Sequence, residues 1–448
     1  MASSITRKKV FLFGAGAVID WAGPRTICDR EKLTMLPDHL PPHEKSNRVC
    51  CLTHLLLETG FENKHGEKVS ASIFKNLQQR GISKDRLNFE TIISFVEDLF
   101  SYYANEPEKR LGILGDQSPA EWIKDLFHFK TEPVGKGLYH YSFTIPGREF
   151  PHEHGVKVGT PPEQLFCKFL FHEMLSGIVG HVSKYSYWSN TRDNIVVNAT
   201  NEKLNHAFIL WMQSFVNLDY SLRMYTLNYD SIFRHLLEQV DVEVFDGFEK
   251  ADSGFEERGL HVPDPGGILS NDNGHIHYNL HGCSDWRVED INDSGMPSYQ
   301  YFRSGAPHIE SSEAVVEFEK GRRLLLSNII SGYQKVQRTY VTPFRQMLAS
   351  FDHDCLEAEE IFLIGYSYAD EHINEIIRNA KKYKPDIKIT VINPTFNNDQ
   401  FMVDFLLHWG HPVQFIYEKV GDEVIASQYN FKGIAKTFGE FLLSNLKV

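Results

Sequence analysis

Short apolar runs recur along the chain and end in glycine or in small polar residues. The first run is Val10 to Phe13, which follows two lysines and leads into Gly14-Ala15-Gly16. An apolar run of this length, bounded in this way, is typical of a buried parallel strand that ends in a tight turn. Comparable runs predict further strands at residues 222–227, 242–245, 275–280, 323–326, 361–364, 387–392 and 413–417.

Apolar residues at helical spacing fill most of the intervals between these runs. Because strands and helices alternate in the second half of the chain, the pattern predicts a parallel sheet with helices on both faces. Before residue 220 the pattern is mainly helical, apart from an irregular or hairpin stretch at 117–161. The predicted helices are 49–57, 88–103, 163–182, 202–216 (apolar nearly all round and therefore expected to be buried), 230–239, 334–348, 370–383 and 434–443.

The order of these elements predicts the fold class and the domains. The class is α/β, with a Rossmann-like parallel sheet that has helices on both faces and is interrupted by a large, mainly helical insertion. The first strand lies near residue 10, and the other strands begin after residue 220. We therefore expect a Rossmann-like domain at 1–30 and 220–448, and the insertion at 31–219.

Charge and cysteine content narrow the class of protein. The 448 residues include 46 Lys and Arg and 59 Asp and Glu, a formal net charge of −13 at pH 7, which argues against direct nucleic-acid binding. The six cysteines form no Cys-x-x-Cys pair, which suits reduced thiols and neither a disulfide framework nor a zinc ribbon. The apolar run after Lys9 is too short for a signal peptide, and no run reaches transmembrane length. We expect a cytoplasmic protein without membrane contact.

Glycine-containing or polar motifs follow five of the predicted strands. Ligands of open parallel sheets bind at the carboxyl edge of the strands, so these residues are candidates for one common site. Glycines let the backbone approach a pyrophosphate, whose charge suits the start of the next helix. The motifs are Gly14-Ala15-Gly16, Tyr225-Thr226-Leu227-Asn228-Tyr229-Asp230, His277-Tyr278-Asn279-Leu280-His281-Gly282, Gly365-Tyr366-Ser367-Tyr368-Ala369-Asp370 and Asn393-Pro394.

Each motif taken alone also has a purely structural interpretation. The dinucleotide fingerprint needs a third glycine where Ile19 stands, and a glycine turn after a strand is often no more than a turn. Asn228 suits a turn or a helix N-cap, and His281 suits a histidine satisfied in the core. His275, His277 and His281 alternate on one strand, but no carboxylate or thiol completes a familiar metal-ligand spacing. We predict no metal.

Taken together and in this order, the five motifs resemble the sirtuin superfamily. Sirtuins open with a Gly-Ala-Gly turn, then carry an Asn-x-Asp and a His-Gly at the ends of later strands. They use a Gly-x-Ser turn and an Asn after the last strands to hold the adenosine half of NAD. The resemblance covers Lys8 to Arg25 and roughly Leu222 to Pro394, and the insertion is unmatched.

The chain also departs from the sirtuins that remove acyl groups. Those enzymes have a zinc module built on two Cys-x-x-Cys pairs between the Asn-x-Asp and the Gly-x-Ser, and this chain has no such pair. Leu227 replaces the Gln that usually precedes the Asn, and Val18 stands where their glycine turn continues with Ser. The pattern looks closer to the bacterial sirtuin-like NAD hydrolases of antiphage defence. These have a helical insertion after the first strand and frequently a segment like Asn88-Phe89-Glu90.

The resemblance implies a role for each candidate residue. Asn228 would orient the ribose and the attacking water, and His281 would be the general base. Histidine suits this role because its unperturbed pKa lies near neutrality. Asp230 would fix the nicotinamide amide or brace the site. The implied NAD-binding residues are Gly14, Ala15 and Gly16 at the pyrophosphate, together with Thr226, Gly365, Ser367 and Asn393.

The function implied is that of a metal-independent NAD glycohydrolase, which converts NAD and water to nicotinamide and ADP-ribose. It would act as the effector of a bacterial antiphage defence system and stay inactive until triggered. No sensor, Argonaute-like or ATPase segment is visible, so we expect a homo-oligomer with a separately encoded ATPase, Argonaute-like or nucleotide-sensing partner. Two alternatives stay open: a sirtuin-type protein deacylase or ADP-ribosyltransferase, and a non-catalytic sensor of NAD-derived nucleotides.

Overall fold

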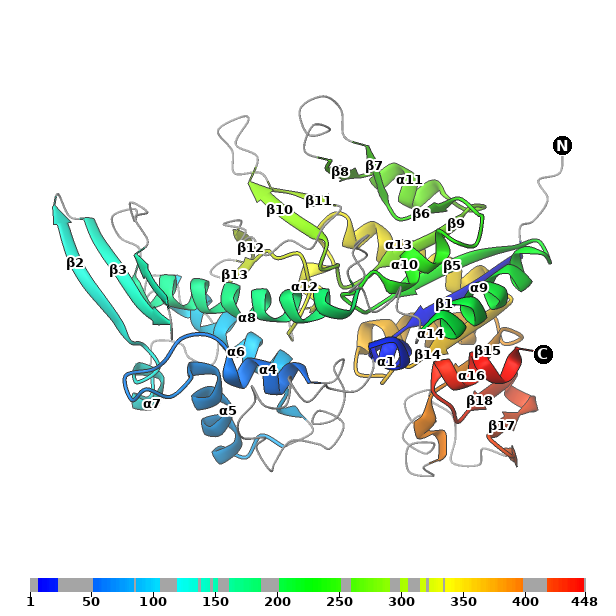
Figure 1. The fold of residues 1–448 in the computed structure, drawn as a ribbon, viewed down its shortest axis with the longest axis horizontal. Helices are drawn as coiled ribbons and strands as arrows, with labels where there is room; N and C mark the ends of the chain where they lie inside the picture. The colour runs from blue at the N-terminus through cyan, green and yellow to red at the C-terminus, as the bar shows by residue number, and fades with distance from the viewer. Residues whose placement is uncertain are drawn as a thin grey trace.

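An α/β fold with a large, mainly parallel sheet forms the centre of the protein (Figure 1). The sheet has nine strands in the order β16-β17-β18-β15-β14-β1-β5-β9-β6. All neighbours from β18 to β6 are parallel, and β16 and β17 add an antiparallel edge. The predicted fold class is confirmed. The computed structural model describes residues 7–22, 51–83, 86–104, 119–135, 138–145, 148–151, 161–186, 201–250, 259–290, 299–304, 315–319, 322–332, 335–397 and 417–446.

The first strand, β1 (Arg7–Phe13), lies in the middle of this sheet, between β14 and β5. It is buried on both faces beyond Arg7, as its continuous apolar run predicts. Alternate residues enter different cores: Phe11 and Phe13 lie in one, and Val10 and Leu12 in the other. The other strands of the sheet are β5 (Tyr220–Thr226), β6 (Val244–Phe245), β9 (His275–Asn279), β14 (Glu360–Ile364), β15 (Lys388–Ile392), β16 (Glu418–Val420), β17 (Glu423–Ala426) and β18 (Phe431–Ile434).

Helices cover both faces of the sheet, also as predicted. The core around Phe11 includes α9 (Glu202–Val216), α10 (Ile232–Leu237) and α16 (Phe438–Asn445). The opposite core includes α11 (Pro265–Ser270), α13 (Phe344–Glu357) and α14 (Glu371–Tyr383). The expectation that residues 202–216 are buried all round is wrong: Leu210 is 41% exposed. The helix belongs to the outer layer, so only one of its sides packs on the sheet.

Three strand and helix predictions need comment. The run at 323–326 forms β13 (Arg322–Leu325), which pairs antiparallel with β12 (Val315–Glu319) and lies outside the main sheet. Residues 413–416 of another predicted strand lie outside the described residues. The closing helix begins at Phe438 instead of residue 434, because residues 431–434 form a strand of the sheet.

A mainly helical region precedes the sheet's second strand and extends away from the sheet (Figure 1). It contains α4 (Leu52–Glu58), α5 (Val69–Gln79), α6 (Phe89–Ala104), α7 (Glu121–Lys124) and α8 (Pro162–Ser186). The stretch 117–161 includes the expected hairpin, in a sheet of β2 (Phe129–Gly135), β3 (Leu138–Ile145) and β4 (Arg148–Pro151). The division at 31–219 stays a prediction. The last helix of that range, α9, packs on the sheet.

The longest helix of the helical region, α8, also passes the length and hydropathy test for a membrane span. The prediction that no run reaches transmembrane length is therefore wrong for this helix by length and composition. In the structure, 61% of its apolar window is buried, and its Phe171 and Met174 lie in the core with α4 and α6. This burial is typical of the core helix of a soluble protein. A cytoplasmic location stays a prediction.

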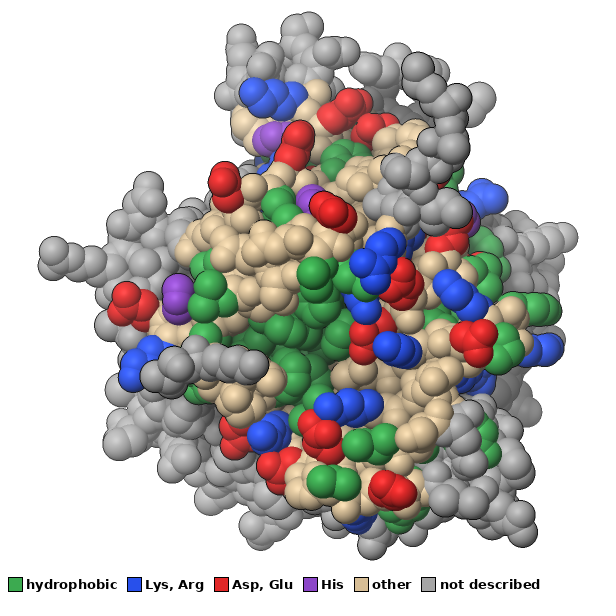
Figure 2. Space-filling model, turned by 90° about the vertical axis from the view of Figure 1, so that its right-hand side faces the viewer, with side chains coloured by type: hydrophobic (Ala, Val, Ile, Leu, Met, Phe, Trp, Pro, Cys, Tyr) green, Lys and Arg blue, Asp and Glu red, His purple; other side chains and the backbone are tan. Residues whose placement is uncertain are grey.

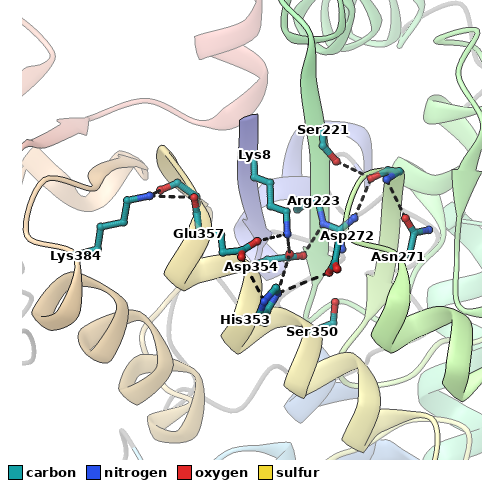
Figure 3. A network of polar contacts seen from close by, with 12 residues as sticks. Lys8, Ser221, Arg223, Asn271, Asp272, Ser350, His353, Asp354, Glu357 and Lys384 are labelled. Carbon is teal, nitrogen blue, oxygen red and sulfur yellow. Dashed lines mark hydrogen bonds and ion pairs between the residues drawn. The ribbon is translucent and has the colours of Figure 1, made fainter. Parts of the chain in front are cut away.

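A second sheet and a buried ionic network lie beside the main sheet. The small sheet consists of β7 (Phe248–Lys250), β8 (His261–Pro263), β10 (Trp286–Asp290) and β11 (Tyr299–Arg303). In the network, the Asp354 carboxylate of α13 accepts from Lys8 Nζ at 3.0 Å and from Arg223 Nε at 2.5 Å (Figure 3). These side chains join α13 to the amino-terminal half of β1 and to the middle of β5.

Charges of both signs share the molecular surface. On the face drawn in Figure 2, side chains of Lys and Arg alternate with those of Asp and Glu around a central apolar area. The prediction of no direct nucleic-acid binding is not tested by this arrangement.

Candidate functional site

The candidate site is a cavity of about 320 Å³ at the carboxyl edge of the main sheet. Such a volume lies within the roughly 300–1,000 Å³ of small-molecule sites. The chain passes from β1 to β5 and β9 on one side and returns to β14 on the other, so the order reverses between β1 and β14. Open α/β sheets bind ligands at a reversal of this kind. The cavity is lined by Gly14, Ala15, Leu52, Thr53, Asn88, Phe89, Glu90, Val182, Tyr185, Leu227, Asn228, Tyr229, Asp230, His281, Lys335, Tyr366, Ser367, Ala369 and Asp370.

Four of the five motifs therefore meet at one cavity, as their strand-end positions predicted. Gly14 follows β1, Asn228 follows β5, His281 follows β9 and Ser367 follows β14. The structure places Gly16, Thr226, Gly365 and Asn393 behind these residues and not in the cavity wall. Their predicted contact with NAD stays a prediction, and each of them also has a structural role in the turns.

The glycine turns after β1 and β14 interlock. Gly16 N–H donates to Gly365 O at 2.9 Å, and Gly14 N–H donates to Ile364 O at 2.9 Å. A Cβ on Gly365, whose φ is +58°, would lie 2.1 Å from Ala17 N. A Cβ on Gly14 would lie 2.6 Å from Gly365 O. The glycines are thus required for the close approach of two backbone turns, and the Gly16 amide already has an acceptor. Only Gly14 and Ala15 of this turn reach the cavity.

The loop after β5 is held in place by its own backbone and by β9. Thr226 Oγ1 accepts from Asn228 N–H at 3.0 Å. Asn279 Nδ2 donates to Asn228 O at 3.3 Å, which joins the ends of β5 and β9. The cap-like contact at the start of α10 comes from Asp230, whose Oδ1 accepts from Ile232 N–H at 3.1 Å. Asn228 is therefore not the helix cap of the structural alternative, and its Nδ2 has no partner among the described residues.

Asp230 is an unusual carboxyl group. Its side chain is 4% exposed and lines the cavity. Burial raises its pKa to about 7, and the hydrogen bond from Ile232 N–H lowers it only partly. Near neutral pH this group is therefore divided between its protonated and its ionised form. A carboxyl group with this property can exchange protons in the range where enzymes work.

His281 is fixed by the segment that follows β13. Its carbonyl oxygen accepts from Ile330 N–H at 2.7 Å, and the next residue, Gly282, has a φ of +79°. A Cβ at Gly282 would lie 2.1 Å from Asn328 O, so a glycine is required where this segment crosses the turn. The ring centroid of His281 lies 5.9 Å from that of His372.

The imidazole of His281 is neutral, and its Nε2 has no hydrogen-bond partner among the described residues. Its side chain is 2% exposed. Burial lowers its pKa to about 3, although the nearby Asp370 carboxylate opposes this shift. At neutral pH the ring is therefore unprotonated and can accept a proton. With this lowered pKa it is a weaker base than a histidine with the ordinary value near neutrality, which was the value assumed from the sequence. A histidine satisfied in the core, the structural alternative, would have partners on its ring nitrogens.

A lysine and two carboxylates complete the polar wall. Lys335 Nζ lies 2.6 Å from Glu90 Oε1 and 2.7 Å from Asp370 Oδ1. Burial lowers the pKa of Lys335, but the two carboxylates raise it more, so the ammonium stays charged. For Asp370 burial raises the pKa, and His281 and Lys335 more than offset this. Glu90 belongs to α6, so the helical region contributes an ionic side chain to the site.

The sequence analysis missed Lys335 and gave no role to Glu90 or Asp370. Both carboxylates stand in motifs that were noted, Asn88-Phe89-Glu90 and the motif after β14. Lys335 begins the short helix α12 (Lys335–Arg338), and no sequence pattern marks it. Its two partners lie far from it in the chain, so only the fold brings the three together.

Ser367 and Asn393 differ in their positions. Ser367 is exposed and lines the cavity, consistent with a ligand contact. Asn393 Nδ2 donates to Tyr366 O at 3.2 Å, and its Oδ1 accepts from Thr395 N–H at 3.0 Å. Asn393 therefore joins the turn after β15 to the turn after β14, and it acts on the cavity only through Tyr366.

One group of described residues has the composition of a metal site. Ligand-type atoms of His353, Asp354 and Glu357 lie within 4.8 Å of one another. The Asp354 carboxylate already binds Lys8 and Arg223, and Lys8 Nζ lies 2.5 Å from Glu357 Oε2 (Figure 3). Two basic side chains thus occupy the oxygens that a cation would need. This group lies at the opposite edge from the cavity.

Comparison with known protein families finds a match to one part of the chain. Residues 223–399 match the model of the SIR2-like domain. This domain supports the resemblance to the sirtuin-like superfamily and indicates a sirtuin-like, NAD-related function. The matched span contains Asn228, Asp230, His281 and the motif after β14, whereas β1 and α6 lie outside it. A search of the curated proteins finds no match to the chain.

Proposed function

We propose that the protein is an NAD glycohydrolase. The observation that carries the proposal is the neutral imidazole of His281, whose Nε2 has no partner among the described residues, in one cavity with Asn228 and Asp230. Buried polar atoms without partners, such as His281 Nε2 and Asn228 Nδ2, are costly unless a ligand or water pairs with them. A nucleotide and a water that occupy this cavity would supply those partners.

The chemistry follows from these side chains. Water adds its oxygen to C1′ of the nicotinamide ribose, and the bond from C1′ to the pyridinium nitrogen breaks. The electron pair of that bond stays on the nitrogen, so nicotinamide leaves neutral. The proton lost by the water goes to His281, and Asn228 orients the water and the ribose. An oxocarbenium-like transition state has positive charge on the sugar, which the ionised form of Asp230 stabilises.

The alternatives predict different products. A protein deacylase would transfer an acyl group to ADP-ribose, and the deacylating sirtuins use a zinc module whose cysteine pairs this chain lacks. A non-catalytic sensor of NAD-derived nucleotides would need the cavity but not a histidine with a free lone pair. The presence of both His281 and Asn228 in the cavity favours catalysis.

The decisive experiment is an incubation of the purified protein with NAD, alone and together with the product of the neighbouring gene. Nicotinamide and ADP-ribose in equal amounts support hydrolysis. Acyl-ADP-ribose in the presence of an acylated peptide would establish deacylation instead. Binding of NAD without any product under either condition would favour the sensor.

We also propose the biological setting that the sequence resemblance implies. An unregulated NAD hydrolase would exhaust the NAD of its own cell, so the activity must be suppressed until infection. The proposed role is that of an antiphage effector that forms a homo-oligomer and responds to a separately encoded ATPase, Argonaute-like or nucleotide-sensing protein. The contribution of α4, α6 and α8 to the cavity wall supports regulation through the helical region.

A further inference from the structure

The charged wall of the cavity has more negative than positive groups. Lys335 forms ion pairs with both Glu90 and Asp370, at 2.6 and 2.7 Å. One ammonium therefore faces two carboxyl groups, so the wall has an excess of one negative charge when both are ionised. Burial raises the pKa of Glu90, and the neighbouring Lys335 opposes this shift. Asp230, whose pKa is about 7, adds further negative charge as the pH rises. His281 contributes none at neutral pH because its ring is unprotonated.

These carboxylates face a ligand site and are not simply a solvated surface. Glu90, Asp370 and Lys335 all line the cavity, and their side chains are only 11–20% exposed. The same cavity contains His281 Nε2 and Asn228 Nδ2, which lack partners in side chains that are 2% and 7% exposed. Unpartnered polar atoms in such buried side chains point independently to a bound molecule.

A buried excess of negative charge selects among ligands by charge. In a partly buried site, where charges are screened less than in water, it favours a cation and disfavours a neutral ring of the same shape. Oxidised and reduced NAD differ in this respect: the nicotinamide ring is a cationic pyridinium in the first and a neutral dihydropyridine in the second. The pyrophosphate is the same in both and cannot account for a preference.

We propose that Glu90 and Asp370, with Lys335 setting their charge balance, select the cationic ring of oxidised NAD over the neutral ring of the reduced form. The proposal rests on the proposed function, because it assumes that NAD enters this cavity. It assigns Glu90 of the helical region and Asp370 of the sheet to one specificity-determining group. The cation that they select is also the better leaving group, since it departs as neutral nicotinamide.

The test compares the dissociation constants of carbocyclic NAD in its oxidised and reduced forms by titration calorimetry. These probes differ only in the nicotinamide ring, and the carbocycle prevents cleavage. The full-length protein is compared with Glu90→Gln, Asp370→Asn and Lys335→Met. Glu371→Gln is the matched control: it removes the same charge from the next residue, whose side chain is 66% exposed and does not line the cavity.

We expect the unsubstituted protein to prefer the oxidised probe. Glu90→Gln and Asp370→Asn are each expected to reduce the ratio of the two affinities about tenfold, a change typical of losing one partly buried charge near a ligand. Lys335→Met is expected to increase the ratio. Glu371→Gln is expected to leave it within about twofold, since the Glu371 side chain is exposed, pairs with Arg378 and does not line the cavity.

Three results would overturn the inference while leaving the proposed function intact. They are no preference in the unsubstituted protein, an unchanged ratio in both Glu90→Gln and Asp370→Asn, or an equal reduction in Glu371→Gln. A lower ratio in Lys335→Met would overturn it even where one carboxylate variant fails to fold, as judged by thermal melting. If the unsubstituted protein binds neither probe, the proposed function itself fails.

Discussion

At the scale of single residues, the first prediction concerns His281 as the general base. Replacing His281 with Ala removes the base but none of the interlocked backbone turns. We expect the turnover number for NAD to fall about 100-fold or more, with little change in NAD affinity or melting temperature, because a general base acts on the rate. Asn228→Ala should behave in the same way, since it loses the orientation of the water. Activity of His281→Ala within a few-fold of the parent would exclude the proposed role.

The shifted pKa of Asp230 predicts how activity depends on pH. If the ionised form stabilises the sugar cation, kcat/KM rises with pH with a midpoint near 7, the pKa that burial gives this group. His281 does not change its protonation state near pH 7, because its pKa is about 3, so it adds nothing to this rise in kcat/KM. Initial rates from pH 5 to 9 test the prediction, and the rise near pH 7 should be lost in Asp230→Asn. If the rise persists in this variant, it belongs to another group.

The pKa of a second buried histidine, His277, leads us to expect that the free energy of unfolding depends on pH. Its side chain is 1% exposed, and burial lowers its pKa to about 3 from an ordinary value near 6.5. Between these values the unfolded chain binds a proton that the folded one does not, so stability is complete above pH 6.5 and is lost as the pH falls towards 3. The free energy of unfolding should fall by about 1.4 kcal/mol per pH unit from this residue. Urea titrations of His277→Leu should show a correspondingly shallower decline; an identical decline would exclude the histidine as its source.

At the scale of elements, the sequence predicted the strands of the sheet better than it predicted their partners. A continuous apolar run marks β1 or β14 because a parallel strand is buried on both faces. The same local signal marks β13, which pairs elsewhere, since nothing in residues 322–325 specifies the partner strand. The site shows the same limit. Because both residues follow parallel strands, the sequence predicted that Asn228 and His281 lie together. Lys335 could not be predicted as a site residue, because it reaches the cavity only through the packing of α6 and α12.

The interlocked turns after β1 and β14 predict which glycine the fold cannot lose. An alanine at Gly365 would have a φ of +58° and a Cβ 2.1 Å from Ala17 N. We expect Gly365→Ala to lower the free energy of unfolding by roughly 2–4 kcal/mol, from backbone strain and overlap together. Gly421→Ala is the control, since Gly421 has a similar φ of +61° but no atom within 4 Å, and strain alone should cost about 1 kcal/mol. Equal losses in the two variants would show that the close approach adds nothing.

At the scale of the whole molecule, the helical region and the sheet share one cavity. Thr53, Glu90 and Tyr185 line it from α4, α6 and α8, and a buried ion pair between Glu97 and Arg338 joins α6 to α12. A displacement of α6 relative to α12 would therefore have to break this pair and the pair between Glu90 and Lys335.

This arrangement predicts that assembly and a partner control the activity. We expect the resting protein to form a homo-oligomer with low activity, and the partner's signal to shift the helical region towards an open cavity. A ligand shifts such an equilibrium only through different affinities for the two states, so the partner should bind the assembled, triggered form more tightly. Light scattering gives the mass in solution, and NAD consumption is measured with and without the neighbouring gene product. A monomer that is fully active alone would refute this control and leave the NAD hydrolase assignment intact, because His281 and Asn228 need only the cavity to act.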